Sequence, residues 1–255
     1  MDLGLKGLKA VVTGGTKGIG RAIAQTLAAE GAHIAFCARN ADEVEQTSKD
    51  FAAAYPGIKV HGVVADVGDA AGLAAFVNGA AAAFGGLDIV VANVSALAIP
   101  NDEANWQKTF EVDMMGTVRL VNAAMPYLEQ SSAASIVTIS SVSGREIDFA
   151  SGPYGAFKAA IVHYTQGLAY HLAGKKIRAN TVSPGNTYFK GGVWEQIEHG
   201  NPDLFKMALG LNPTGRMGTP QEMANAAVFL ASPAASFITG TNLVVDGALT
   251  KGVQL

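Results

Sequence analysis

Short apolar runs alternate with longer segments of helical period along the whole chain. Runs rich in Val, Ile and Ala are typical of buried strands, and apolar positions that recur every three or four residues are typical of helices. The pattern predicts strands at residues 8–13, 33–37, 58–65, 87–92, 134–139, 177–182 and 242–245. It predicts helices between them, at residues 21–32, 42–55, 70–84, 105–128, 153–173 and 219–230.

Strands that alternate with helices in this way form a parallel sheet with helices on both faces. No linker or change of composition divides the chain, so we expect one doubly wound α/β domain over residues 1–255. In an open sheet of this kind, ligands bind beyond the carboxyl ends of the strands. Polar residues or glycines follow the predicted strands, at Gly14, Arg39, Asp66, Asn93, Ser141 and Ser183.

Tyr154 and Lys158 are four residues apart at the start of the helix predicted over 153–173. This spacing places both side chains on one helical face, one turn apart. A free phenol is a poor base at neutral pH, and a nearby cation stabilises its ionised form. Ser141, which follows the preceding strand, is suited to hold the oxygen of a carbonyl or alcohol. The alternative interpretation of the same spacing is a surface pair on an amphipathic helix.

Glycines gather between the first strand and the first helix, in the run TGGTKGIG at 13–20. Gly14, Gly18 and Gly20 allow the backbone to approach a pyrophosphate, which the N–H groups at a helix N-terminus favour. The strand, glycine loop and helix therefore predict a dinucleotide site. A tight turn that binds no ligand is the alternative.

Composition narrows the classes of protein that the chain can represent. Apolar residues make up 49% and charged residues 15%, so we expect a large core without disulfides or metal. The net charge of −3 gives no reason to expect nucleic acid or an anionic membrane as a partner. No apolar run approaches the roughly 20 residues of a membrane span, so we expect a cytoplasmic protein. Cys37, the only cysteine, is expected in the core.

With these residues assembled, the chain resembles the short-chain dehydrogenase/reductase family over essentially its whole length. The matching motifs are TGGTKGIG at 13–20, Asp66-Val67, Asn93, Ser141 with Tyr154 and Lys158, Pro184-Gly185, and TGTNLVVDGA from 239. The resemblance implies a Rossmann-like domain with a seven-stranded parallel sheet. It also implies hydride transfer between a nicotinamide and a carbonyl or alcohol carbon, for which the protein supplies orientation and the proton.

The resemblance implies roles for the catalytic candidates. Tyr154 is the expected general acid/base, Lys158 favours its phenolate and holds the nicotinamide ribose, and Ser141 orients the substrate oxygen. Other matching residues are expected to bind the cofactor, Asp66 and Val67 at the adenine ring. The cofactor candidates are Gly14, Thr16, Lys17, Gly18, Ile19, Gly20, Arg39, Asp66, Val67, Asn93, Tyr154, Lys158, Pro184, Gly185 and Thr187.

Two positions depart from the family pattern. The turn after the fourth strand reads Asn93-Val-Ser95, with serine in place of the usual glycine. The helix predicted over 105–128 has Asp113 where the family has a catalytic asparagine, so Asp113 joins the catalytic candidates. A carboxylate there would hold Lys158 protonated more firmly and offset its pull on Tyr154, which predicts an altered pH profile. The alternative is that Asp113 is only a helix-kink residue.

The residues after the second strand favour NADP(H) over NAD(H) as the cofactor. NAD-selective proteins place an acid there, which accepts from the ribose 2′-hydroxyl. This chain has Ala38-Arg39 instead, and Arg39 is suited to a 2′-phosphate. Lys17, inside the glycine loop, is a second cation within expected reach.

Residues 186–217 correspond to the family's mobile lid over nicotinamide and substrate. The segment is apolar and bulky, so we expect Phe189 and Trp194 to contact a small lipophilic or aromatic carbonyl compound. A 3-oxoacyl-[acyl-carrier-protein] reductase is the alternative enzyme, but the chain shows little of the basic patch that an acidic carrier needs. A cofactor-binding regulator or scaffold is the alternative outside enzymes. The resemblance also implies a homo-oligomer, either a dimer or a tetramer.

Overall fold

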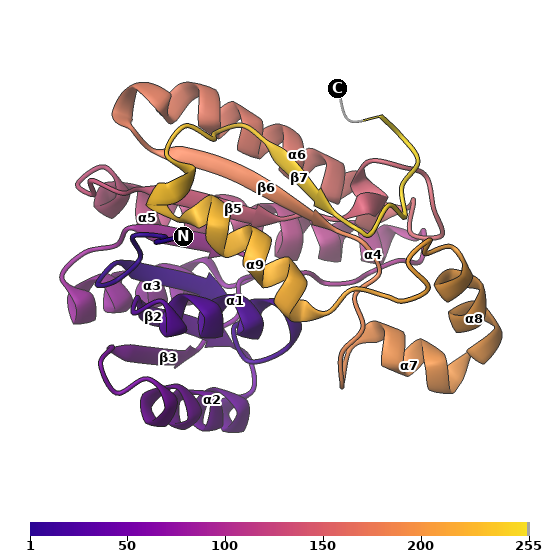
Figure 1. The fold of residues 1–255 in the computed structure, drawn as a ribbon, viewed down its shortest axis with the longest axis horizontal. Helices are drawn as coiled ribbons and strands as arrows, with labels where there is room; N and C mark the ends of the chain where they lie inside the picture. Colours follow the sequence, from indigo (N-terminus) through magenta and orange to yellow (C-terminus); the bar gives the residue numbers. More distant parts are fainter. Residues whose placement is uncertain (254–255) are drawn as a thin grey trace.

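The computed structural model describes residues 1–253 and contains a sheet of seven parallel strands (Figure 1). Their order is β3-β2-β1-β4-β5-β6-β7. The strands are β1 (Lys9–Thr13), β2 (His33–Ala38), β3 (Val60–Val64), β4 (Ile89–Ala92), β5 (Ser135–Ile139), β6 (Arg178–Pro184) and β7 (Asn242–Val245). The strand prediction is confirmed, and the predicted bounds differ by at most two residues at either end.

The strand order changes direction at β1 and β4, which pair with each other near the middle of the sheet. The sheet grows through β2 on one side of this pair and through β5 on the other. The segment after β1 therefore leaves toward one face and the segment after β4 toward the opposite face, which opens a crevice at their carboxyl ends. Open α/β sheets bind their ligands at this kind of switch point.

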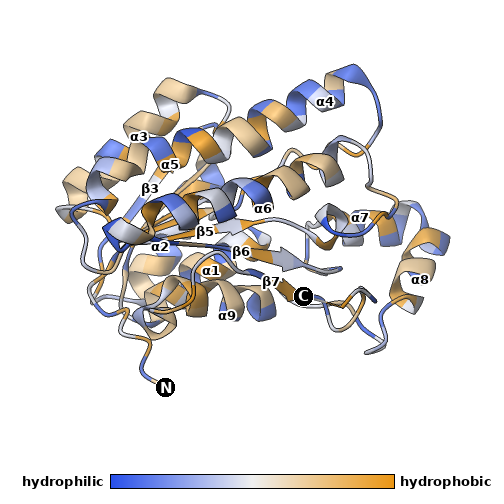
Figure 2. Ribbon diagram, turned by 90° about the horizontal axis from the view of Figure 1, so that it is seen from above, coloured by the Kyte–Doolittle hydropathy of each residue, from blue (hydrophilic) through white to orange (hydrophobic). Residues whose placement is uncertain are grey.

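Helices cover both faces of the sheet, and each face has its own apolar core (Figure 2). Val11 and Val90 enter one core, whereas Val12 and Val91 enter the other, because successive side chains of a strand point to opposite faces. One face carries α1 (Gly18–Ala29), α2 (Ala41–Ala54) and α9 (Pro220–Ala231); the other carries α3 (Ala70–Phe84), α5 (Gly116–Leu128) and α6 (Pro153–Leu172).

The helix predicted over 105–128 is divided into three parts, which corrects that prediction. It comprises α4 (Glu103–Thr109), a π-helical turn at Phe110–Met115 and α5. No glycine or proline stands at the start of the π-helical turn. The apolar periodicity of the sequence therefore continues through all three parts, and it predicted a single helix. Side-chain contacts accompany the change: the Thr117 hydroxyl donates to the Asp113 carbonyl oxygen at 2.6 Å. Such turns inside helices are frequent at functional sites.

The segment expected to form a lid contains two helices that the sequence pattern did not predict, α7 (Val193–Gly200) and α8 (Pro202–Gly210). Figure 1 shows them beyond one edge of the main body, in orange. Trp194, Ala208 and Met217 form a small core of their own. The two ends of the segment are hydrogen-bonded to each other, because the Gly218 N–H donates to the Asn186 carbonyl oxygen at 2.8 Å. The segment is thus a compact unit with a closed base.

Two helical glycines give opposite predictions for substitution by alanine. A Cβ at Gly20 in α1 would overlap the Gly14 carbonyl oxygen and the Asn93 amide. Gly20→Ala is therefore expected to lower the free energy of unfolding by about 1–3 kcal/mol. A Cβ at Gly167 in α6 would meet no heavy atom of residues 1–253 within 4 Å, so Gly167→Ala is expected to raise it by about 0.5–1 kcal/mol. Urea unfolding measures both, and equal effects would contradict the close packing at Gly20.

Candidate active site

A cavity of about 590 Å³ lies at the carboxyl ends of the strands, at the point where the strand order changes direction. Gly20 and Asp113, both site candidates, do not line it. The other candidates do: Gly14, Thr16, Lys17, Gly18, Ile19, Arg39, Asp66, Val67, Asn93, Ser141, Tyr154, Lys158, Pro184, Gly185, Thr187, Phe189 and Trp194. The fold therefore brings candidates between Gly14 and Trp194 together at the carboxyl ends of the strands.

Tyr154 and Lys158 lie in the first turns of α6, which begins at Pro153. Proline suits this first position because an N–H group there would have no helical partner. The Lys158 side chain is 2% exposed, and its Nζ donates to the Ile139 carbonyl oxygen at 3.1 Å. The same Nζ lies 5.6 Å from the centre of the Tyr154 ring. The surface-pair interpretation is therefore wrong, because the ammonium group is buried beside the phenol.

Ser141 follows β5 and caps the short 3₁₀ helix Val142–Gly144. Its Oγ accepts from the Ser143 N–H at 3.2 Å and donates to the Ser143 hydroxyl at 3.3 Å. Ser143 Oγ in turn donates to Asp148 Oδ2 at 2.6 Å. Because 3.3 Å is long for an O–H donor, the Ser141 hydroxyl can turn toward a substrate oxygen at little cost. Ser143 and Asp148 also line the cavity, and no motif in the sequence marked them.

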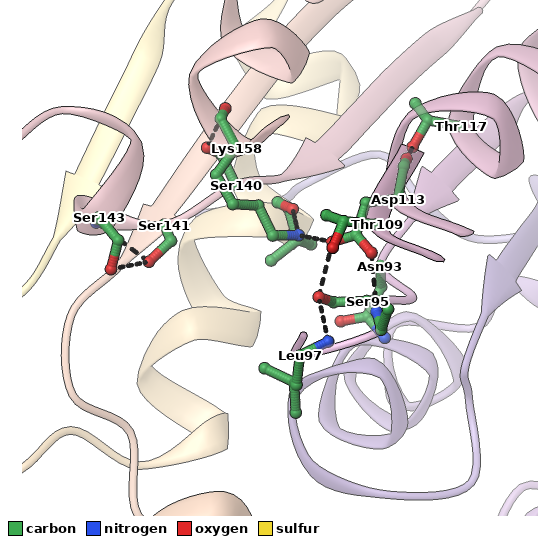
Figure 3. A network of polar contacts seen from close by, with 12 residues as sticks. Asn93, Ser95, Leu97, Thr109, Asp113, Thr117, Ser140, Ser141, Ser143 and Lys158 are labelled. Carbon is green, nitrogen blue, oxygen red and sulfur yellow. Dashed lines mark hydrogen bonds and ion pairs between the residues drawn. The ribbon is translucent and has the colours of Figure 1, made fainter. Parts of the chain in front are cut away.

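Asp113 does not line the cavity. Its carboxylate contacts Lys158 Nζ (Figure 3). It is fully buried, and its Oδ1 is 3.3 Å from Lys158 Nζ. The Ser95 hydroxyl donates to the same oxygen at 2.6 Å. Asp113 therefore contacts Lys158, and the helix-kink interpretation does not account for this ion pair.

The glycine loop between β1 and α1 approaches its neighbours closely. The N–H groups of Gly14 and Gly15 donate to the Cys37 carbonyl oxygen at 2.8 and 3.2 Å. Gly14 has a φ of +69°, which favours glycine. No side chain in the described part of the chain caps α1, so the amides of its first turn are available to an anion such as a pyrophosphate. Gly20 does not line the cavity, and its lack of a side chain allows α1 to approach the Gly14 carbonyl oxygen and the Asn93 amide.

The end of the cavity beside β2 carries the cations expected to bind a 2′-phosphate. Lys17 Nζ lies 2.6 Å from Glu43 Oε1, and the Thr16 hydroxyl donates to Glu43 Oε2 at 3.1 Å. Glu43 lines the cavity and was not recognised in the sequence, since it lies within a helix and belongs to no motif. Arg39 lines the cavity and makes no ion pair within residues 1–253. Arg39 is therefore the cation that is available to an anionic ligand.

Three further candidates have partners inside the protein. Asp66 Oδ1 accepts from the Gly68 N–H at 2.9 Å, and the Thr187 hydroxyl donates to the Gly185 carbonyl oxygen at 3.0 Å. Asn93 Nδ2 donates to the Thr13 carbonyl oxygen at 3.0 Å, so this residue braces β1 against β4. The resemblance implies that this asparagine contacts the cofactor or braces the central strand, and its hydrogen bond to Thr13 is a bracing contact.

The aromatic residues of the lid segment differ in placement. The sequence predicts Phe189 at the substrate, but its ring packs against Gly18, where an added Cβ would lie 2.5 Å from the ring. A turn at Gly191, whose φ is +77°, follows Phe189. Trp194 is 5% exposed and packs edge-on against Phe149, with 5.8 Å between ring centroids. Phe149 comes from the loop after β5, lines the cavity and carries no sequence signal for this role.

The fold and the cavity define a class of protein. A glycine loop at the switch point of a doubly wound sheet is suited to a dinucleotide. Ser141, Tyr154 and Lys158 provide hydrogen-bonding and proton-transfer groups at the same edge. This arrangement is that of a nicotinamide-dependent oxidoreductase for alcohol and carbonyl groups.

The chain belongs to the short-chain dehydrogenase/reductase family, because the family model described as Enoyl-(Acyl carrier protein) reductase matches residues 14–250. Isoepoxydon dehydrogenase patN of Penicillium expansum is 40% identical over 100% of this chain and 99% of that protein. Cis-4-hydroxycyclohexanecarboxylate dehydrogenase of Sinomonas cyclohexanicum is 35% identical over 94% and 96%. The L-sorbose reductase of Gluconobacter frateurii, solved with NADPH and L-sorbose, has a TM-score of 0.90 and 29% identity and covers 99% of this chain and 100% of that chain. The chain is therefore an enzyme, not a regulator or scaffold.

Cys37 provides a test of how tightly this edge of the sheet is packed. The residue lines the cavity but is only 1% exposed, and burial raises the pKa of its thiol to about 12. Since the thiolate is the reactive form, thiol reagents are expected to leave Cys37 unmodified in the folded protein at mildly alkaline pH. Spectrophotometric counting should find the one thiol after unfolding in urea. Equal rates of modification in the folded and unfolded protein would contradict the burial.

Proposed function

We propose that this protein is an NADP(H)-dependent oxidoreductase that interconverts a ketone and a secondary alcohol on a small alicyclic ring. The proposal is carried by the cavity that brings Ser141, Tyr154 and Lys158 together beside the glycine loop. Phe149 and Trp194 add apolar aromatic surface to the same cavity, which suits the hydrocarbon part of a ring. The substrate of the Sinomonas relative, named cis-4-hydroxycyclohexanecarboxylate, supports this substrate class.

The groups of this chain divide the reaction between them. When bound, the nicotinamide supplies the hydride to the carbonyl carbon or removes it from the alcohol. In the reducing direction, the Tyr154 hydroxyl gives its proton to the carbonyl oxygen, and Ser141 holds that oxygen by a hydrogen bond. Lys158 stabilises the phenolate that remains on Tyr154 until a proton from solvent restores the phenol. The net reaction joins one hydride and one proton to the ketone.

The cofactor preference rests on Arg39 more than on Lys17. Arg39 is suited to a 2′-phosphate, whereas Lys17 must first leave Glu43. That separation is inexpensive, because the Lys17 side chain is 61% exposed and exposed ion pairs contribute only about 0–1 kcal/mol. NADPH bound to the L-sorbose reductase of similar fold supports the same preference.

A free small molecule suits this protein better than a substrate attached to an acidic carrier protein. Few cations lie near the end of α5, where the sequence reads Tyr127-Leu-Glu129. Lys175 approaches this region, but its Nζ is 2.6 Å from Glu129 Oε1 and is therefore already paired. The few cations of this region therefore offer even less unpaired positive charge to an acidic carrier than the sequence suggests.

The proposed chemistry predicts that Tyr154→Phe lowers kcat for ring ketones by about 10²–10⁴-fold, because the variant lacks the proton donor. A panel of cyclic and open-chain ketones, with acyl thioesters included, is followed by the absorbance of NADPH. Tyr164→Phe, in the same helix but outside the cavity, is the matched control and should retain wild-type rates. A preference for acyl thioesters, or an active Tyr154→Phe variant, would contradict the proposal.

The cation arrangement predicts opposite effects for two substitutions. Arg39→Ala should raise KM for NADPH by about tenfold or more and leave KM for NADH nearly unchanged, because only NADPH carries the 2′-phosphate. Glu43→Gln should lower KM for NADPH, because it releases Lys17. Initial rates with each cofactor give the ratio of the two KM values. A ratio that neither variant moves would assign the preference to other residues.

Assembly and location are further expectations. None of the helices in residues 1–253 has both the length and the apolar character to cross a membrane. The homo-oligomer stays a prediction that light scattering after gel filtration can check, and the cytoplasmic location stays a prediction as well.

A further inference from the structure

The two positions at which the chain departs from its family pattern, Ser95 and Asp113, are in direct contact (Figure 3). The Ser95 hydroxyl donates to Asp113 Oδ1 at 2.6 Å, and Lys158 Nζ lies 3.3 Å from the same oxygen. The Ala96 N–H donates to Oδ2 at 2.7 Å. The carboxylate of Asp113, itself fully buried, thus faces a hydrogen-bond donor on each oxygen.

These donors favour a carboxylate over an asparagine at position 113. An asparagine has one oxygen and one NH₂ group at the end of its side chain. If its oxygen accepted from Ala96, the NH₂ group would face the Lys158 ammonium; in the reverse orientation it would face the Ala96 N–H. Either orientation places two donors against each other in a buried site, which is costly. The aspartate is therefore specified by its surroundings.

The same contacts fix the loop that follows β4. The Leu97 N–H donates to Ser95 Oγ at 3.1 Å, and Leu97 has a φ of +48°, which is uncommon for a residue other than glycine. Ser95, Ala96 and Leu97 all line the cavity. Asp113 therefore connects one cavity wall to Lys158 on α6.

We propose that Ser95 and Asp113 form one positioning unit, in which the Ser95 hydroxyl sets how much of the Asp113 charge acts on Lys158 and, through it, on Tyr154. The inference rests on the proposed role of Tyr154 as the proton donor. The negative charge of Asp113 offsets the ammonium field at the phenol, and the hydrogen of the Ser95 hydroxyl offsets part of that negative charge.

Other ionisable groups lie on the elements that pack around Ser95 and Asp113. Within residues 1–253, Lys158 is the only ion-pair partner of Asp113, and Glu111 of the same π-helical turn pairs instead with Arg119 of α5 at 2.9 Å. The remaining groups on the elements packed around the turn are Glu103 and Lys108 on α4, Tyr127 on α5, and Tyr154, His163, Tyr164, Tyr170 and His171 on α6; Asp148 faces the same cavity.

The unit predicts opposite shifts for its two members. Asp113→Asn removes a negative charge, so Tyr154 should ionise at a pH lower by about one unit. Ser95→Ala removes the hydroxyl hydrogen that offsets the carboxylate, so Tyr154 should ionise at a higher pH. The double variant should behave like Asp113→Asn alone, because the hydroxyl has no carboxylate left to act on.

Two measurements report the shifts. The near-ultraviolet absorbance of tyrosinate is titrated in each protein, with Tyr154→Phe in the same background subtracted to isolate Tyr154. This measurement needs no substrate or cofactor. The pH dependence of kcat/KM for ring-alcohol oxidation with NADP⁺ should shift in parallel.

The matched control is a second serine–aspartate contact, at the amino ends of β1 and β4, away from the cavity. The Ser131 hydroxyl donates to Asp88 Oδ1 at 2.6 Å, and the Lys9 N–H donates to Asp88 Oδ2 at 2.9 Å. Neither Ser131 nor Asp88 lines the cavity. Ser131→Ala and Asp88→Asn should lower the midpoint of urea unfolding, as we also expect of the site variants, without moving the Tyr154 titration.

The outcomes separate this inference from the proposed function. An unshifted Tyr154 titration in Ser95→Ala, or a double variant whose shift is the sum of the single shifts, would overturn the unit. A wild-type protein that turns over no ring ketone or alcohol would overturn the proposed substrate class and leave the titration to judge the unit. If Ser131→Ala and Asp88→Asn shifted the Tyr154 titration as much as the site variants, the shift would result from a general loss of stability and the unit would be overturned.

Discussion

The buried pair of Lys158 and Asp113 is the interaction on which the site depends. It joins α6 to the π-helical turn, and Lys158 reaches the end of β5 through its bond to Ile139. Two charges removed from water are stable only if further hydrogen bonds satisfy them, and Ser95, Ala96 and Ile139 provide such bonds. The pair holds the Lys158 ammonium group 5.6 Å from the centre of the Tyr154 ring.

The sheet determines where this pair can act. Its order changes direction between β1 and β4, so the glycine loop and the loop after β4 face each other across one crevice. Asn93 holds the two strand ends together from within that crevice. The anion-binding end of α1 and the proton-transfer groups of α6 are consequently held on the same edge by a rigid framework, which is what hydride transfer between two bound molecules requires.

The lid segment is organised differently from the body. Its helices α7 and α8 enclose a small core of their own, and its base is closed by bonds between Asn186, Tyr188 and Gly218. The lid residues Phe189, Val193 and Trp194 nevertheless line the same cavity as the glycine loop. Phe189 and Trp194 link the lid to the body, because Phe189 packs on the glycine loop and Trp194 packs against Phe149.

The sequence by itself determined the seven strands to within two residues, the helices between most of them, the glycine loop and the candidates Ser141, Tyr154 and Lys158. These follow from local periodicity and from motifs at fixed positions relative to strand ends. The tertiary structure decided the π-helical turn, the helices of the lid, the pairing of Lys17 with Glu43 and the contact between Ser95 and Asp113. Each of these depends on contacts between residues that the fold brings together. The periodicity and motifs of the sequence carry no information about such contacts. Ser95 and Asp113 were two separate oddities in the sequence, and only folding made them one site.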